Sequence, residues 1–154
     1  MIRYFLLFRQ ILPFIFLNII MSIILTSCKK ETIDVNSFWN CNNSQGLDSL
    51  ATANKLSSSW LWSKQYCDNG MGTKKADKNI KIIFNSIGTF SILENSISIS
   101  QGTWKLKKVE DNLYALNLSQ PSKYLYGRIL FCDNQVLFSN SYLDGCDNLF
   151  TKSN

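Results

Sequence analysis

The stretch IKIIFNSIGTFSILENSISISQGTWKL, residues 80–106, decides the fold of this chain. Apolar and polar side chains alternate along it with a period of two, the spacing that places every second side chain on one face of a β-strand. Turn-forming residues interrupt the alternation at residues 85–88 and at Glu94-Asn95. The stretch therefore predicts three consecutive antiparallel strands joined by tight turns.

In the third of these strands, the apolar side chains change from odd-numbered to even-numbered positions. Ile97 and Ile99 are its odd-numbered apolar residues, whereas Trp104 and Leu106 are even-numbered. One extra residue, a β-bulge at Gly102, restores a single inward face and adds the bend that a closed barrel needs.

The alternating pattern extends in both directions from this stretch. A first strand is expected from Trp60 to near Cys67, then a turn-rich loop over 68–75, and further strands over 114–118, 124–132, 135–138 and 146–152. Helical spacing of apolar residues predicts a short helix over 47–57. The fold class is thus all-β: a small antiparallel up-and-down barrel of about eight strands with a short N-terminal helix. An open two-sheet sandwich is the alternative.

The first residues have the pattern of an export signal. Arg3 and Arg9 precede a mostly apolar stretch, residues 11–25, that ends in Leu25-Thr26-Ser27-Cys28. These four residues resemble the lipobox of bacterial lipoprotein precursors, which implies cleavage before Cys28 and lipidation of that residue. Two or three acyl chains anchor a protein stably without a spanning helix. An uncleaved N-terminal anchor is the alternative, but the apolar stretch is shorter than the ~20 residues that span a bilayer comfortably.

The expected organisation is a signal peptide over 1–27, a polar tether over 28–45 and one barrel domain over 46–154. Lys follows Cys28 where Asp resembles an inner-membrane retention signal, so we expect the outer membrane, facing either the periplasm or the cell surface. Of sixteen basic side chains, Arg3 and Arg9 lie in the leader, which leaves fourteen against eleven acidic ones. This small excess is spread along the chain, so no nucleic-acid partner is expected.

The cysteines of the mature chain indicate two disulfides. Besides Cys28 there are four, an even number for an oxidising compartment. In a meander, Cys132 and Cys146 are separated by the length of one strand, about 20 Å, whereas a disulfide tolerates at most about 7 Å between Cα atoms. Strands one and eight are neighbours in a closed barrel, and residue 41 precedes the helix at the end where strand six finishes. We therefore predict Cys67–Cys146 and Cys41–Cys132.

Several short motifs resemble the small lipocalin-like domains of bacterial lipoproteins. They are Trp60-Leu61-Trp62 with Cys67, residues 82–90, Gly102-Thr103-Trp104-Lys105-Leu106, and Leu143-Asp144-Gly145-Cys146-Asp147. The resemblance implies the same barrel and a small apolar ligand. The Gly-x-Trp signature of true lipocalins, however, lies on their first strand, and here it lies in mid-chain.

The chain offers few residues suited to catalysis, so we expect no enzyme activity and no cofactor. The chain has no histidine, so nucleophile systems that depend on histidine are absent. The acidic residues Glu94, Glu110, Asp111, Asp133 and Asp144 all fall in predicted turns, where such side chains cap the backbone. Cysteine spacing without CxxC pairs does not indicate zinc, and the loop at Asp144 lacks the spaced ligands of a calcium loop. No metal site is predicted.

Two sets of residues are the candidate binding sites. The first is a group of aromatic residues that either line a ligand cavity or fill the barrel interior: Trp60, Trp62, Trp104, Phe84, Phe90, Phe131 and Phe138. The second is Tyr124, Tyr126 and Arg128, which point outward if Leu125 and Ile129 point inward, and which suit a protein or glycan partner. The expected function is binding of a small apolar ligand. The alternative is an interaction, inhibitor or structural envelope protein that uses an outer face of the barrel.

Overall fold

A computed structural model describes residues 33–67 and 71–153 of the chain. The compact unit that contains them begins at Thr32. The predicted signal peptide, residues 1–27, and the predicted lipidation site, Cys28, lie outside the described residues. No helix within the described part is long and apolar enough to cross a bilayer.

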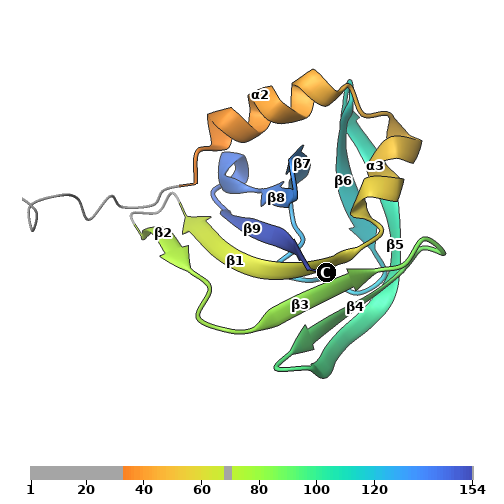
Figure 1. Cartoon of the computed structure of the whole chain (residues 1–154), viewed down its shortest axis with the longest axis vertical. Coiled ribbons are helices and arrows are strands. Elements are labelled where there is room, and N and C mark those ends of the chain that lie inside the picture. Colours follow the sequence, from red (N-terminus) through yellow and green to blue (C-terminus); the bar gives the residue numbers. More distant parts are fainter. Residues whose placement is uncertain (1–32, 68–70, 154) are drawn as a thin grey trace, which may run out of the picture. The chain divides into compact units, whose positions relative to one another are not determined.

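The strands form one closed antiparallel barrel (Figure 1). They are β1 (Ser59–Cys67), β2 (Gly72–Lys75), β3 (Ile80–Phe84), β4 (Thr89–Glu94), β5 (Ile97–Glu110), β6 (Leu113–Leu118), β7 (Arg128–Cys132), β8 (Gln135–Ser139) and β9 (Cys146–Ser153). From β3 to β9 each strand pairs with the next, and β1 pairs with both β3 and β9. The pairing of β1 with β9 runs from Ser59–Ser153 to Cys67–Cys146 and closes the barrel. The predicted up-and-down barrel is confirmed.

Strands β2 and β3 share one edge of β1. Residues 64–67 of β1 pair with β2, and residues 59–61 pair with β3. Between these two pairings the Ala76 N–H still donates to the Ser63 carbonyl at 2.9 Å, and residues 77–79 form the bend that leads into β3. The predicted loop over 68–75 was therefore wrong for residues 72–75, which form a strand because β1 extends past β3 and offers free backbone groups.

The bulge of β5 does not lie at Gly102. Phe90 pairs with Gly102 in regular register, and the register shifts where Ile92 pairs with Ser100 but Leu93 pairs with Ser98. The extra residue is Ile99, which is exposed, as is Ile97. A side chain at Gly102 would collide with the residue that follows β6, since a Cβ there would lie 2.5 Å from Ser119 Oγ. The absent side chain lets the end of β6 approach β5 closely.

Two helices precede the barrel: α2 (Val35–Gln45) and α3 (Ser49–Leu56). Asp34 caps α2 and Asp48 caps α3, each by accepting a backbone N–H of the first turn with its carboxylate. The predicted helix over 47–57 is confirmed as α3. The expectation of a polar tether over 28–45 was wrong for residues 35–45. Only a narrow stripe of α2 is apolar, which is why its sequence resembled a linker.

The barrel has an apolar core on each side of its wall. Inside it, a cluster of seventeen buried residues takes side chains from β1 and from every strand between β3 and β9. Outside it, α2 covers Leu130, Leu137 and Leu149. Consecutive residues of β7 and β8 are buried for this reason, since both faces of these strands are covered.

Both predicted disulfides are confirmed. Cys41 of α2 is joined to Cys132 at the end of β7, and Cys67 of β1 is joined to Cys146 of β9. The two bonds lie at opposite ends of the barrel, because β1 ends where β9 begins and β7 ends on the other side. We call these the Cys67 end and the Cys132 end.

Candidate ligand site at the barrel seam

The barrel wall opens into a seam between β6 and β7. These strands share two residue pairs, Tyr114 with Ile129 and Ala115 with Arg128. Residues 116–118 of β6 continue to pair with β5, while the connection over residues 119–127 leaves the sheet at the Cys67 end. Because Pro121 has no backbone N–H to donate, the connection cannot continue the ladder at that point.

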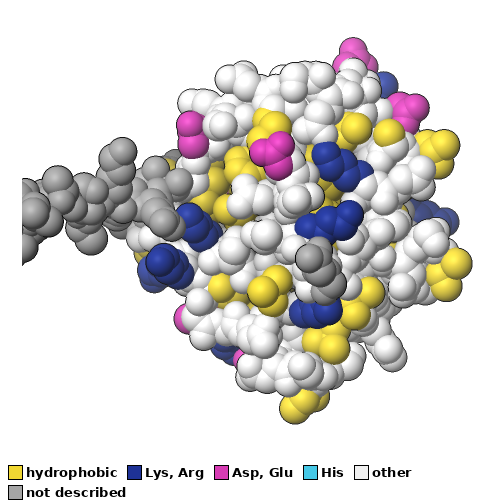
Figure 2. Space-filling view, viewed as in Figure 1, with side chains coloured by type: hydrophobic (Ala, Val, Ile, Leu, Met, Phe, Trp, Pro, Cys, Tyr) yellow, Lys and Arg dark blue, Asp and Glu magenta, His cyan; other side chains and the backbone are white. Residues whose placement is uncertain are grey.

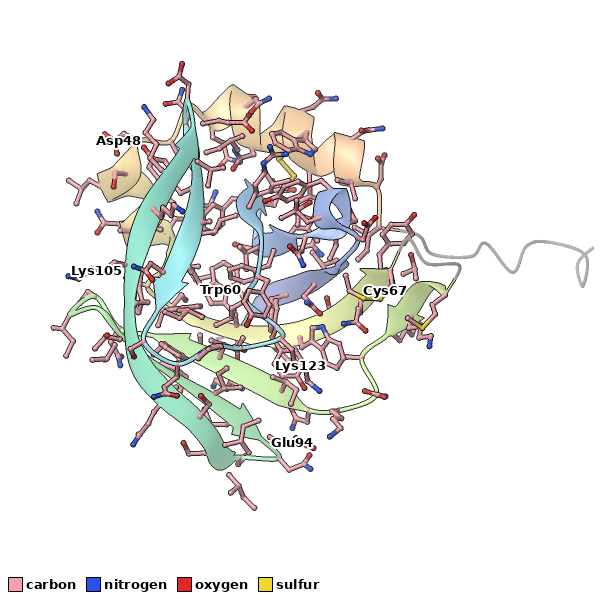
Figure 3. The ribbon with its side chains drawn as sticks, turned by 180° about the vertical axis from the view of Figure 1, so that it is seen from behind. Asp48, Trp60, Cys67, Glu94, Lys105 and Lys123 are labelled. Atoms are coloured by element: carbon pink, nitrogen blue, oxygen red, sulfur yellow. A yellow bond between two sulfur atoms is a disulfide. The ribbon has the colours of Figure 1, made fainter. Side chains whose placement is uncertain are left out.

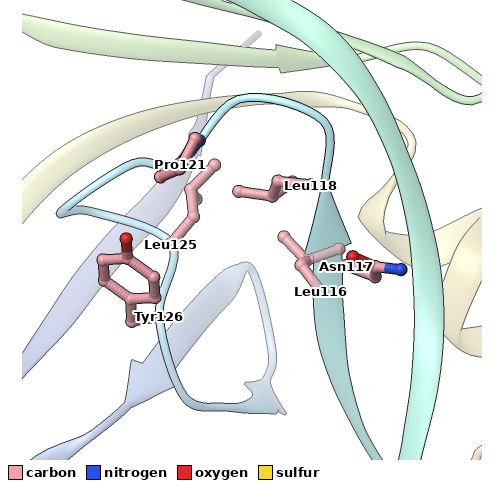
Figure 4. A pocket seen from close by; sticks show the side chains of 6 residues that line it. All are labelled: Leu116, Asn117, Leu118, Pro121, Leu125 and Tyr126. Carbon is pink, nitrogen blue, oxygen red and sulfur yellow. The ribbon is translucent and has the colours of Figure 1, made fainter.

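A pocket of about 210 Å³ occupies the seam (Figure 4). Its lining residues come from β6 and from the connection: Leu116, Asn117, Leu118, Pro121, Leu125 and Tyr126. Leu116 and Leu118 also pack against the interior core, so the pocket floor is continuous with that core. The pocket lining is more apolar than polar. Asn117 alternates with Leu116 and Leu118 along β6, so its amide points away from the pocket (Figure 4). These features define a candidate site for a small apolar group.

The connection also closes the mouth of the barrel at the Cys67 end. Tyr124 is 5% exposed and packs edge-on against Trp62, with 5.2 Å between the ring centroids. Asn148 of β9 donates a hydrogen bond from Nδ2 to the carbonyl of Lys123 at 3.3 Å, which ties the connection to the far wall. The predicted outward position of Tyr124 was wrong. Residues 121–127 form no strand, so alternation does not decide which way their side chains point.

Arg128 and Tyr126 have different environments. The Arg128 guanidinium stacks on the rings of Tyr142 and Trp39, at 4.1 and 5.4 Å from their centroids, and pairs with Glu110. Arg128 does point outward from β7 as predicted. Its guanidinium, however, is occupied by these contacts within the same chain. Tyr126 is 49% exposed and remains accessible at the edge of the seam pocket. Tyr124, Tyr126 and Arg128 therefore do not form one outward stripe.

The predicted aromatic set comes together in the barrel interior. Every one of its members is buried in one cluster: Trp60, Trp62, Phe84, Phe90, Trp104, Phe131 and Phe138. Several contacts are edge-on, such as Phe84 with Trp104 at 5.6 Å. The indole N–H of Trp60 donates to the Leu56 carbonyl at 2.8 Å, and that of Trp104 to the Thr89 carbonyl at 3.0 Å. These rings pack as core residues, and none of them lines the seam pocket.

Two larger hollows are open grooves at the barrel wall. One, of about 600 Å³, lies over residues 89–91 and 101–102. The other, of about 540 Å³, lies where β2 and β3 part from β1, and it is bordered by Trp62, Lys75 and Lys78. The Trp62 Nε1–H is buried and has no hydrogen-bond partner among the described residues. This second groove has the same balance of polar and apolar lining as the seam pocket, but charged side chains border it.

Two lysines near the barrel ends have shifted pKa values. The hydrogen bond from Lys78 Nζ to Glu94, at 2.8 Å, raises the pKa of the lysine above its ordinary value. At the Cys132 end, partial burial lowers the pKa of Lys55, and the nearby carboxylate of Asp133 opposes this shift. Asp133 also lies beside Cys41 and Cys132, but those sulfur atoms are joined to each other and present no thiolate to a metal ion.

The sequence does not reveal the seam pocket directly. Leu116 and Leu118 have the alternation of ordinary strand residues, and Leu125 falls in a stretch that the pattern predicts as a strand. Pro121, which breaks the strand pattern, is the available signal that β6 and β7 separate here.

Fold and site together define a class: a small disulfide-linked β-barrel with an apolar pocket in its wall. Comparisons with protein-family models, with curated proteins and with solved structures found no match to this chain.

Proposed function

We propose that this protein is an exported, lipid-anchored lipoprotein of the outer membrane whose lipocalin-like barrel binds a small apolar ligand and catalyses no reaction. The leader pattern and the position of Cys28 support the lipid anchor, and two disulfides support an oxidising compartment. The seam pocket is the observation that carries the ligand-binding part of the proposal.

The size of the pocket limits what it binds. Drug-sized ligands occupy pockets of roughly 300–1,000 Å³, whereas a cavity of about 150 Å³ lined by apolar side chains accommodates benzene. A pocket of about 210 Å³ therefore suits one ring or a short alkyl segment. The half-exposed Tyr126 at its edge offers a hydroxyl group to a polar substituent of the same ligand.

Methyl NMR spectra test the ligand proposal. Benzene and 1-hexanol serve as probes, and we expect the methyl resonances of Leu116, Leu118 and Leu125 to shift in a saturable manner. Leu116→Phe fills the pocket and should abolish the shifts, whereas Leu61→Phe on the exposed face of β1 should preserve them. Unchanged spectra at saturating probe, together with native mass spectra free of any co-purifying small molecule, contradict ligand binding.

Mass spectrometry of the protein from membranes tests the anchor. The mature N-terminal peptide should begin at Cys28 and carry the mass of a diacylglycerol group and an additional acyl chain. Cys28→Ala should remove this mass and release the barrel from the membrane. A lipid label that persists in Cys28→Ala would rule out the lipoprotein assignment.

One observation favours a second function. The barrel interior is occupied by the aromatic cluster, so the outer surface is the larger area open to a partner. In this alternative, exposed residues such as Tyr126 contact a protein or glycan of the envelope, or a hydrolase that the barrel inhibits. If the probes leave the leucine methyl groups unchanged, this alternative replaces the first.

A further inference from the structure

Exposed apolar side chains lie on both sides of the disulfide at the Cys67 end. Met71 directly precedes β2, and Tyr142 and Leu143 lie in the short 3-10 helix η1 (Ser141–Leu143) that leads toward Cys146. We call these three residues the apolar rim. Leu143 is 65% exposed. The Cys67–Cys146 bond joins the end of β1 to the start of β9, with 4.3 Å between the Cα atoms.

Hydrogen bonds to a buried carboxylate fix the loop that carries Leu143. Asp147 is fully buried, and its Oδ1 accepts hydrogen bonds from the backbone N–H groups of Asn140 and Ser141 at 2.6 and 2.7 Å. Its Oδ2 accepts the Ser141 hydroxyl at 2.9 Å. Leu143 is therefore held outward by a fixed network, although an inward position would remove its side chain from water.

Basic side chains accompany the apolar rim. Lys74 and Lys75 of β2 are exposed, and Figure 2 shows basic side chains, coloured dark blue, over the β2 region. Figure 3, seen from behind, places Cys67 at the end of β1 that lies against β2. Among the described residues, the exposed acidic side chains near the rim include Asp144, next to Leu143, and Asp77, two residues after Lys75. An exposed apolar group flanked by lysines fits the interfacial region of a membrane that contains anionic lipids.

The short stretch between Cys28 and Ile33 limits how far the Cys67 end lies from the lipid anchor. The described chain begins at Ile33, whose N–H donates to Thr73 Oγ1 of β2 at 3.4 Å. Positions 28 and 33 are five residue steps apart, and five steps span at most about 18 Å when fully extended. The nine residues of β1 cover about 30 Å, or roughly 22 Å along the axis of a barrel with a strand tilt near 40°. Because about 18 Å is shorter than roughly 22 Å, a lipid on Cys28 excludes an upright barrel that stands on its Cys132 end.

We propose that the apolar rim, with Lys74 and Lys75, is a membrane-contact surface that seats the Cys67 end on the bilayer in which Cys28 is anchored. This inference rests on the proposed lipid anchor. Met71, Tyr142 and Leu143 enter the headgroup region, and the two lysines lie beside anionic phosphates. The Cys132 end, with Ile87 in the β3–β4 turn, points into the aqueous phase.

Power-saturation electron paramagnetic resonance of the full lipidated protein tests this orientation. A nitroxide is attached through an azide-bearing phenylalanine at position 143 or 87, so that the native cysteines stay untouched. Ile87 is the matched control because it is 83% exposed and lies at the opposite end. The vesicles contain phosphatidylethanolamine with a minor fraction of phosphatidylglycerol. We expect a several-fold higher ratio of oxygen to nickel-chelate accessibility at position 143 than at position 87.

The outcomes separate the two proposals. Equal accessibility ratios at both positions, in protein whose Cys28 carries lipid by mass spectrometry, overturn the orientation and leave the anchor intact. Absence of lipid on Cys28 overturns the anchor and the orientation with it. A charge-reversing pair, Lys74→Glu and Lys75→Glu, should lower the ratio at position 143 on vesicles with phosphatidylglycerol and leave it unchanged on phosphatidylcholine vesicles. An unchanged ratio on both vesicles contradicts the role of the lysines.

Discussion

Tyr124 packs edge-on against Trp62 in the mouth of the barrel, with their ring centroids 5.2 Å apart. The next residue, Leu125, lines the seam pocket and is also buried. One short connection therefore closes the barrel mouth and forms one wall of the pocket. A ligand in the seam contacts the same segment that covers the aromatic interior.

The contact between Tyr124 and Trp62 predicts a large stability difference between two neighbouring tyrosines. Tyr124→Ala should lower the free energy of unfolding by about 3 kcal/mol, because it removes a buried ring and leaves a cavity beside Trp62. Tyr126→Ala removes a half-exposed ring and should cost less than about 1 kcal/mol. Urea denaturation of both variants measures the difference, and equal midpoints contradict the role of Tyr124 as a buried plug.

Gly127 should tolerate no side chain. It adopts a positive φ of 96°, and a Cβ there would lie 1.9 Å from the carbonyl oxygen of Ser139. Gly127→Ala must therefore separate β7 from β8 and should cost more than about 2 kcal/mol. Gly46 also has a positive φ, but no atom lies within 4 Å of the point that a Cβ would occupy, so Gly46→Ala should cost only about 1 kcal/mol. Thermal denaturation compares the two, and a milder effect at Gly127 would contradict the close approach.

The Cys41–Cys132 disulfide should hold α2 on the barrel. The bonded residues are 91 positions apart, and removing a link over so long a loop should cost roughly 3–5 kcal/mol in the chain-entropy description. In Cys41→Ser/Cys132→Ser we expect protease cleavage within α2 before the barrel strands are cut. Cys67→Ser/Cys146→Ser is the matched control, because α2 keeps its bond to β7. Early cleavage of α2 in the control as well would show that the helix depends on general stability instead.

Asn42 should matter more than its neighbour Asn43. The Oδ1 atom of Asn42 accepts the backbone N–H of Phe131 at 3.0 Å in a buried position, whereas Asn43 is exposed. Asn42→Ala leaves that N–H without a partner and should cost about 1–3 kcal/mol. Asn43→Ala should change the free energy of unfolding by less than about 0.5 kcal/mol. Chemical denaturation of both variants checks this, together with amide hydrogen exchange at Phe131, which should accelerate only in Asn42→Ala.

Local alternation was sufficient to predict most strands, and strand direction was sufficient to pair the cysteines. Both depend on short-range geometry: side chains repeat every two residues, and a disulfide cannot span a strand. The position of the bulge was not predictable in this way. Ile97 and Ile99 continue the alternation, but they lie where β5 extends beyond the covered part of the barrel, so their apolar character does not bring burial.

The sequence by itself determined the class of fold, the closed order of the strands and the two cysteine pairs, because each follows from periodicity and chain direction. Only the tertiary structure decided that residues 35–45 form a helix over β7 and β8, that Tyr124 turns inward, and that β6 and β7 part to leave the seam pocket. These features depend on contacts between segments distant in the chain. Packing against a neighbour, and not local propensity, supplies most of the free energy that fixes such segments.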